Sequence, residues 1–346
     1  ALCGGVSGVR PLLVQMMVDM LNKGVIPVVP QKGSLGASGD LAPLAHMTLP
    51  MLGKGRAVYQ GVEMDGAEAM AKAGIQPVET LVYKEGLGMT NGTCAMTSVG
   101  TLAWYDSFCA AQLADVIGSM TLEALTGLLN AYDERVHLVR GHKGQLQVAK
   151  NFRLLTEGSE ILSNCQNDRD FMGIACSEIA DISERRTERM VNAALSNGLT
   201  PFLTTEGGVN SGYMIVQYSA ASMVSENKVL AHPASVDSIP SSANQEDMVS
   251  MGTTAARKSG WIVQNTLSVL ADELLTACQA IDIRRRLNTH GQGISPVHQK
   301  VFDRVRKDIA FYETDRELWQ DIQAAEKLVR SGELLEIVHE TVSDFE

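Results

Sequence analysis

Hydrophobic residues recur along most of the chain at the spacing of an α-helix. Residues 9–22 repeat at i, i+3 and i+4, the pattern that turns one apolar face toward a core, and Gly24 follows as a stop signal. The apolar positions are Leu12, Leu13, Met16, Met17, Met20 and Leu21. The same pattern predicts long helices over 93–130, 144–163, 171–195, 213–230, 247–283 and 317–342. We therefore expect a mostly α-helical protein.

Few segments alternate between apolar and polar residues as strands do. The candidates are Val25–Val29, Ala57–Tyr59 and Thr80–Tyr83, enough for a small hairpin but not for a sheet-based core. Between the periodic segments, Gly, Ser, Asn and Pro gather in loops, where binding and catalytic residues are often found. These loops cover 30–40, 52–66, 197–212, 232–246 and 287–297.

Composition narrows the class of protein. Of the 346 residues 45% are hydrophobic and 20% charged, which excludes a disordered or fibrous chain. Sixteen methionines against 5% aromatic residues favour a helical core filled by flexible aliphatic side chains. The 29 basic and 40 acidic residues give a net charge of −11 with both signs interspersed, which argues against a nucleic-acid or anionic-membrane partner. A small-molecule partner is favoured.

Cysteine usage and targeting signals favour the cytoplasm. The six cysteines form no CxxC pair and no Cys/His cluster with the spacing of zinc ligands, so we expect reduced thiols and no metal. No stretch reaches the ~18 to 20 apolar residues of a membrane span, and residues 1–30 lack the pattern of a signal peptide. Because the first residue is alanine, we expect the printed chain to be a fragment or a processed form.

The loop at 31–44 carries the first candidate for chemistry. As a local pattern it predicts a helix start, with Asp40 as N-cap and Pro43 in the first turn. A phosphate-binding loop is excluded because Asp40 stands where GxxxxGK[ST] needs lysine, and the glycine spacing does not fit GxSxG. A third interpretation comes from Ala37-Ser38-Gly39. In a tight bend, the Gly39 nitrogen can attack the Ala37 carbonyl, and loss of two waters gives an electrophilic 4-methylideneimidazol-5-one.

Residues 33–46, Gly-Ser-Leu-Gly-Ala-Ser-Gly-Asp-Leu-Ala-Pro-Leu-Ala-His, resemble the signature of the histidine and phenylalanine ammonia-lyase family, in which this tripeptide forms that prosthetic group. Similar blocks follow in the family's order at 84–87, 90–93, 182–186, 207–212, 225–228, 231–240 and 242–247. The resemblance implies a long-helix bundle of the ammonia-lyase (fumarase/aspartase-like) type with a few short strands, formed by 1–346 as a single domain. It also implies a homotetramer with composite active sites.

Two further blocks carry candidate site residues. Asn91-Gly92 is ordinary turn chemistry, but the resemblance places Asn91 against the prosthetic group, where its amide can hydrogen-bond the ring oxygen. The segment 244–247 is typical of a helix start, where polar side chains satisfy free N–H groups. The resemblance instead implies that Gln245 and Glu246 bind substrate. A carboxylate suits an imidazole better than a phenyl ring, which favours histidine, although the histidine branch commonly has His where Met248 stands.

Charged residues between 184 and 189 form a different kind of block. Arg185, Arg186 and Arg189 stand beside Glu184 and Glu188. Their helical spacing predicts a solvated or interfacial face of ion pairs, with a scaffold role.

The implied reaction is non-oxidative elimination of ammonia from L-histidine to give urocanate, in an enzyme that is a carbon–nitrogen lyase. The predicted catalytic residues are Ala37, Ser38, Gly39 and Asn91, and the predicted substrate-binding residues are Glu246 and Gln245. A phenylalanine or tyrosine ammonia-lyase, a related aminomutase and an inactive truncated helical scaffold are the alternatives.

The sequence departs from the family at two places. Residues 1–36 contain no tyrosine, although the family's catalytic tyrosine lies on a loop before the tripeptide. A long insert is also expected between Arg169 and Asp170, where the two flanking blocks meet directly. A natural deletion, an engineered truncation and segments left out of the printed chain all explain this junction, and we expect the last.

Overall fold

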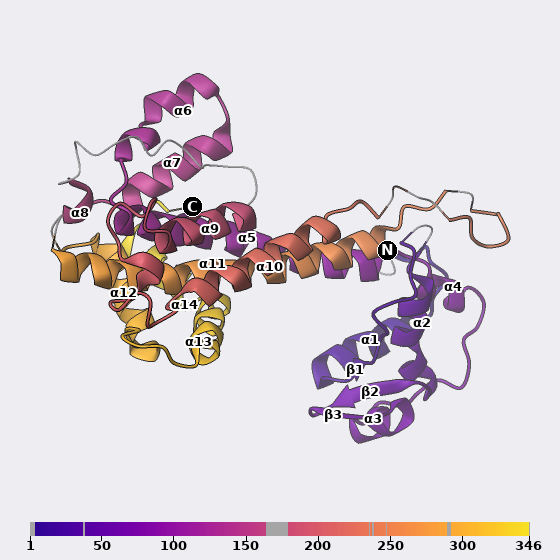
Figure 1. The fold of residues 1–346 in the computed structure, drawn as a ribbon. Helices are drawn as coiled ribbons and strands as arrows, with labels where there is room; N and C mark the ends of the chain where they lie inside the picture. The colour runs from indigo at the N-terminus through magenta and orange to yellow at the C-terminus, as the bar shows by residue number, and fades with distance from the viewer. Residues whose placement is uncertain are drawn as a thin grey trace. The chain divides into compact units, whose positions relative to one another are not determined.

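The computed structural model describes residues 4–36, 39–163, 179–234, 236, 239–246, 248–288 and 292–345 (Figure 1). By Cα proximity the chain divides into two compact units, Ala1–Trp104 with His232–Gly260 and Tyr105–Ala231 with Trp261–Glu346. Each unit has a hydrophobic core of its own. Helices dominate the described residues, as the hydrophobic pattern predicts.

The first unit contains the helices α1 (Pro11–Lys23), α2 (Leu41–Thr48), α3 (Gly66–Lys72) and α4 (Glu85–Thr90), with a 3₁₀ turn at Leu49–Leu52. Helix α1 confirms the prediction for 9–22: proline occupies its first turn, and Gly24 ends it with a left-handed φ of 72°. The core of this unit is rich in methionine, with Met16, Met20, Met51, Met64, Met70 and Met89 among its buried residues. The expectation of flexible aliphatic packing therefore holds here.

A small antiparallel sheet completes the first unit. Strand β2 (Arg56–Tyr59) pairs with β1 (Ile26–Pro27) and with β3 (Val62–Asp65) in the order β1-β2-β3. Gln60 and Gly61 join β2 to β3, and both have positive φ (51° and 80°), as a two-residue hairpin turn requires. The strands predicted at Val25–Val29 and Ala57–Tyr59 are confirmed as the paired β1 and β2, whereas the hairpin partner β3 was not predicted.

The predicted strand at Thr80–Tyr83 is wrong. These residues form the loop and turn that lead into α4, and the third strand instead comes from 62–65, inside a segment predicted to be a loop. Four residues are too few for alternation to separate a strand from an extended loop. The decisive signal was the turn at Gln60-Gly61, which is weak because only its second residue is glycine.

The second unit is helical in all its described elements. It holds most of α5 (Cys94–Ala124) and of α11 (Gly252–Leu287), together with α6 (Glu134–Arg140), α7 (Lys143–Leu155), α8 (Glu160–Ser163), α9 (Ile179–Val191), α10 (Met214–Leu230), α12 (Pro296–Asp308), α13 (Leu318–Ser331) and α14 (Glu333–Thr341). Sequence analysis missed α12, although Ser295 caps it by accepting a hydrogen bond from the His298 backbone N–H at 3.2 Å. Ser-Pro before an apolar pattern was the signal for this start.

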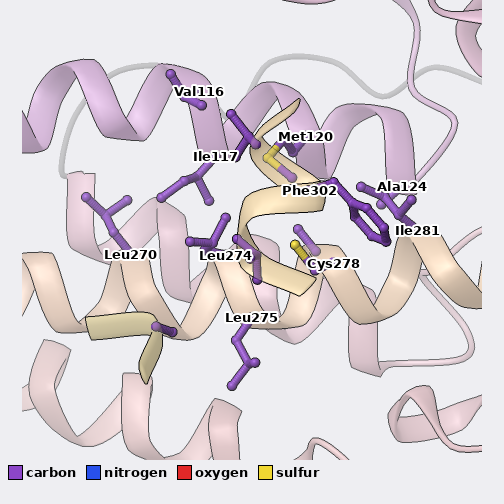
Figure 2. Packing of buried hydrophobic residues seen from close by; sticks show 14 of the residues in the cluster. Val116, Ile117, Met120, Ala124, Leu270, Leu274, Leu275, Cys278, Ile281 and Phe302 are labelled. Carbon is purple, nitrogen blue, oxygen red and sulfur yellow. The ribbon is translucent and has the colours of Figure 1, made fainter. Parts of the chain in front are cut away.

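The core of the second unit lies between α5, α11 and α12 (Figure 2). Helix α5 contributes four fully buried side chains, those of Val116, Ile117, Met120 and Ala124. They pack with Leu270, Leu274, Cys278 and Ile281 of α11 and with Phe302 of α12. Fully burying one such aliphatic side chain contributes roughly 1.5–3 kcal/mol. This shared apolar seam fixes the packing of the three helices.

A buried arginine ties the end of α5 to α11. Arg284 is 1% exposed, and its guanidinium donates to three backbone carbonyl oxygens: Ala124 O at 3.1 Å, Asn197 O at 2.9 Å and Ser196 O at 3.1 Å. Each carbonyl lies where a helix end or turn leaves it without a backbone partner. Arg284 therefore satisfies two buried carbonyl oxygens and one that is partly buried.

We predict that Arg284→Met lowers the free energy of unfolding by ~3–5 kcal/mol, because it leaves buried acceptors unsatisfied. The matched control is Arg286→Met on the same helix, whose 2.8 Å ion pair with Glu313 joins side chains 49% and 58% exposed. The control should cost less than ~1 kcal/mol. Urea unfolding of both variants measures the difference, and equal losses would contradict the role given to Arg284.

Candidate active site

A buried carboxylate organises the loop that contains the candidate tripeptide. Asp40 is 0% exposed and stands directly after Gly39. Its Oδ1 accepts hydrogen bonds from Ser34 Oγ at 2.5 Å and Thr253 Oγ1 at 2.7 Å, and its Oδ2 accepts one from the Met96 backbone N–H at 2.8 Å. Asp40 therefore joins three segments that are distant in the sequence.

Asp40 occupies the N-cap position of α2, but its side chain makes no capping hydrogen bond there. The carboxylate instead serves α5, because Met96 is the third residue of that helix and its N–H belongs to the unpaired first turn. Asp40 is thus at the predicted N-cap position of α2, but its side chain accepts from the first turn of α5 instead. Local spacing could not show this, since 56 residues separate the two groups.

Hydrogen bonds hold Asp40 in its charged form. Burial on its own raises the pKa of this carboxyl, but donation from Ser34, from the Met96 N–H, from Thr253 and from the Ala95 N–H outweighs it and lowers the pKa below the ordinary value. The site therefore contains a buried negative charge that is stabilised by aligned donors.

Residues 250–253, at the start of α11, close over the loop from the other side. Ser250 Oγ donates to the Gly36 carbonyl oxygen at 2.7 Å. Gly36 has a left-handed φ of 65°, and a Cβ there would lie 2.7 Å from the Thr253 backbone nitrogen. Glycine is therefore required at 36 both for its conformation and for the close approach of α11.

Ala37 and Ser38 lie outside the described residues, and Gly39 is the described member of the tripeptide. A Cβ on Gly39 would lie 2.9 Å from Asn91 Oδ1 and 3.0 Å from the Gly92 nitrogen. The Asp40 backbone N–H also donates to the Gly92 carbonyl oxygen at 2.7 Å. The structure thus brings the Asn91 side chain against Gly39, two residues that sequence analysis selected from separate motifs.

Helix α4 positions Asn91, which follows its last residue. Glu85, the first residue of α4, is 0% exposed and pairs with Arg10 through Nε at 2.6 Å and Nη2 at 2.9 Å. The Arg10 hydrogen bond, together with donation from backbone N–H groups, lowers the pKa of Glu85 to about 2. Sequence analysis quoted Glu85 within a family block but missed this anchor, because nothing near Arg10 marks it as a partner.

Gln245 and Glu246 lie in a tight turn rather than at a helix start. The backbones of Ser241 and Glu246 form an isolated antiparallel bridge, and Ser241 Oγ donates to Glu246 Oε2 at 3.0 Å. Residues 242–244 have φ between 52° and 66°, and α11 begins only at Gly252. The helix-start interpretation of 244–247 is therefore wrong, because the left-handed residues close a loop. Gln245 is exposed, Glu246 is half-buried, and Asp247 lies outside the described residues.

Arg186 is not part of the solvated or interfacial face of ion pairs predicted on α9, because its side chain turns to another helix of the same unit. Its guanidinium pairs with Glu273 of α11 at 2.5 Å, and the Glu273 side chain is 0% exposed. Thr121 Oγ1 donates to the same carboxylate at 2.7 Å. Arg185, which is 54% exposed and pairs with Glu184, fits the prediction. Sequence spacing along one helix could not reveal a partner on another.

The described residues offer neither a metal-binding cluster nor a membrane-spanning helix. Among them, no group of three or more His, Cys, Asp or Glu side chains could hold a metal ion. Within that same part of the chain, no helix combines the length and the apolar character that a membrane span needs.

Comparison with known proteins gives the family. The family model described as aromatic amino acid lyase matches residues 1–170 and 164–307. Histidine ammonia-lyase 1 of Fusobacterium nucleatum is 43% identical over 408 aligned residues, which cover 100% of this chain and 78% of the relative. Histidine ammonia-lyase of Caldanaerobacter subterraneus is 46% identical over 403, covering 98% and 78%. The chain belongs to the aromatic amino acid lyase family.

Solved structures agree with this assignment. The histidine ammonia-lyase from Trypanosoma cruzi matches with a TM-score of 0.87 at 35% identity, covering 99% of this chain and 76% of that one. A tyrosine aminomutase from Streptomyces globisporus matches with a TM-score of 0.86 at 27% identity, covering 98% and 78%. The predicted long-helix bundle of the ammonia-lyase type, with a few short strands, is confirmed, and so is the predicted class of enzyme, an amino acid lyase.

The junction near 169–170 falls outside the described residues. The two segments of the family match overlap at 164–170, and the alignment to the Fusobacterium relative is longer than this chain. The explanation of this junction by segments left out of the printed chain stays a prediction.

We predict that Asp40→Asn costs ~1–3 kcal/mol of stability at pH 7, because the amide keeps an oxygen for the Met96 N–H but replaces with an NH2 group the charged oxygen to which Ser34 and Thr253 donate. Because the native pKa of Asp40 is lowered, its contribution is complete above the ordinary aspartate pKa near ~4 and declines as the pH falls through the native value. The difference between parent and variant should therefore shrink in acid.

The control for this prediction is Asp65→Asn, which weakens an exposed 3.3 Å pair with Arg56 in the same unit. It should change stability by less than ~1 kcal/mol at any pH. Thermal unfolding from pH 7 to pH 3 compares the two variants. A gap between parent and Asp40→Asn that stays constant over this range would refute the linkage.

Proposed function

We propose that this protein eliminates ammonia from L-histidine and releases urocanate. The names of relatives that are 43% and 46% identical over nearly the whole chain support histidine as the substrate. The observation that carries the proposal is the packing of Gly39 against the Asn91 amide, beside the buried Asp40 network, inside the motif that resembles the family signature.

The prosthetic group of this proposal is a 4-methylideneimidazol-5-one made from Ala37, Ser38 and Gly39. The described residues fit such a group: Gly39 leaves no room for a side chain, the Asn91 amide lies beside it, and hydrogen bonds hold the residues on both flanks of the tripeptide. When formed, the group supplies an electrophile that takes up the substrate through its amino group or its ring and so acidifies the β-proton.

The chain's own residues bind the substrate and orient it against the prosthetic group. In this proposal the Asn91 amide donates to the oxygen of the prosthetic ring and favours its anionic form. The Glu246 carboxylate accepts a hydrogen bond from the substrate imidazole, or pairs with its positive charge, and Gln245 contributes to the same subsite. Residues 1–36 contain no tyrosine, so the general base is not assigned to any of them.

We further propose a homotetramer in the cytoplasm, acting on a free amino acid without nucleic acid, membrane or metal. Large apolar side chains on α5 support burial against another subunit, since Leu102 is 66%, Tyr105 59% and Phe108 51% exposed. The free cysteines described in the structure, Cys94, Cys109 and Cys278, agree with a reducing compartment.

Two alternatives stay testable. The tyrosine aminomutase match at 27% identity keeps tyrosine and phenylalanine as candidate substrates. An inactive helical scaffold differs by mass, because it would retain the two waters that ring formation removes. Product assay with histidine, tyrosine and phenylalanine, combined with intact mass, separates these alternatives from the proposal.

We predict that Ser38→Ala prevents the second dehydration, because alanine has no hydroxyl to lose, and that histidine turnover then falls by at least ~10³-fold. Intact-protein mass spectrometry and urocanate absorbance measure the two effects. Parental turnover in a variant that lacks the methylidene would overturn the assignment of the tripeptide.

We predict that Glu246→Gln lowers kcat/KM for histidine by at least ~tenfold, because a charged hydrogen bond to the substrate becomes a neutral one. The melting temperature should change little, since an amide still accepts from Ser241 Oγ. Glu63→Gln, at an exposed ion pair in β3, is the matched control. If activity and melting temperature fall in parallel, Glu246 acts through the turn and not on the substrate.

A further inference from the structure

Hydroxyl groups of residues 250–253 hold the chain on both sides of the tripeptide. Before it, Ser250 Oγ donates to the Gly36 carbonyl oxygen at 2.7 Å. After it, Thr253 Oγ1 lies 2.7 Å from Asp40 Oδ1. Thr253 Oγ1 is also 3.2 Å from Ser34 Oγ, which accepts a hydrogen bond from the Gly36 N–H at 3.1 Å. One short segment thus fixes both ends of the loop that must cyclise.

The orientation of Thr253 is specific. Thr253 is the second residue of α11, so the residue four positions earlier lies before the helix, whereas Thr266 deeper in α11 returns its hydroxyl to Ile262 O at 2.8 Å. Thr253, 6% exposed in the first turn of α11, directs its hydroxyl to the Asp40 carboxylate instead. The bond is charge-assisted and buried, which makes it stronger than the neutral bond from Ser250.

We propose that Ser250 and Thr253 are positioning residues for ring closure by Ala37-Ser38-Gly39, an inference that rests on the proposed function. Closure forms a bond between the Gly39 nitrogen and the Ala37 carbonyl carbon. The former carbonyl oxygen leaves as water with the protons of the Gly39 and Ser38 amides. Ser38 then loses its hydroxyl and its α-proton as the second water. The balance requires no oxidant and no external reagent.

The two hydroxyl groups act on the approach of the reacting atoms. Bringing a backbone nitrogen to the carbonyl carbon two residues earlier demands a compressed bend, which a free loop adopts rarely because of its conformational entropy. Fixing Gly36 and Asp40 before the reaction lowers that entropic cost, in the same way that enzymes orient bound reactants. Gly36 and Gly39 permit the bend, and Ser250 and Thr253 hold it.

The test follows ring formation directly, in chains of full length taken at intervals after a short pulse of expression and quenched in denaturant. Intact mass gives the fraction that has lost two waters. Thr253→Val keeps the shape of the side chain but removes the hydroxyl, and should slow the loss about tenfold. Ser250→Ala removes a neutral hydrogen bond and should slow it by a smaller factor, a few-fold.

Two controls separate positioning from stability. Thr253→Ser retains the hydroxyl and should mature at the parental rate. Thr266→Val removes a buried hydroxyl that bonds only within α11, and it should also mature at the parental rate, whatever its effect on the melting temperature. If Thr253→Val does not accumulate as folded protein, Ser250→Ala carries the test.

The outcomes are distinct. A parent protein that never loses two waters overturns the proposed function, and the positioning role with it. If the parent protein loses two waters and the Thr253→Val and Ser250→Ala variants lose them at the same rate, the positioning role alone is overturned. Slowing in these two variants, with rescue by Thr253→Ser, supports it.

Discussion

The buried charge of Asp40 is the constraint on which the candidate site depends. A carboxylate without water is costly unless donors surround it, and here the donors come from Ser34, from the first turn of α5 and from Thr253. Removing any one of these donors would leave the buried charge with fewer hydrogen bonds. The loop that carries the tripeptide is therefore held by a requirement for electrostatic balance, in addition to apolar packing.

This requirement explains why the site residues lie close together although they are distant in the sequence. Asp40 receives its N–H donor from α5, its backbone N–H binds Gly92, and Gly92 follows Asn91 directly. Anchoring of α4 by Glu85 and Arg10 adds a second buried charge that fixes the same corner. Both charged groups accept hydrogen bonds from buried or paired side chains as well as from backbone N–H groups, so the geometry is set before any substrate arrives.

The sequence predicted the helical fold class well, because a long amphipathic segment such as 9–22 repeats its apolar residues at helical spacing over several turns. It failed at Thr80–Tyr83 and at 62–65, where a strand of four residues depends on a turn and a neighbouring strand. The motif at 33–46 identified Gly39, and 90–93 identified Asn91, and the structure brings these two together. Thr253, Ser250 and Arg10 had no local signal, because their role exists only through partners between 75 and 219 residues away.

The methionine-rich core of the first unit has an evolutionary consequence. Unbranched thioether side chains such as those of Met16, Met51 and Met70 can repack around a changed neighbour at small cost. The loop that carries the tripeptide in the same unit has no such freedom, since a Cβ at Gly36 or Gly39 would lie within 3 Å of backbone or amide atoms. Substitutions in this core are therefore tolerated more readily than substitutions at Gly36 and Gly39, so the interior of the unit can change while the geometry of the loop stays the same.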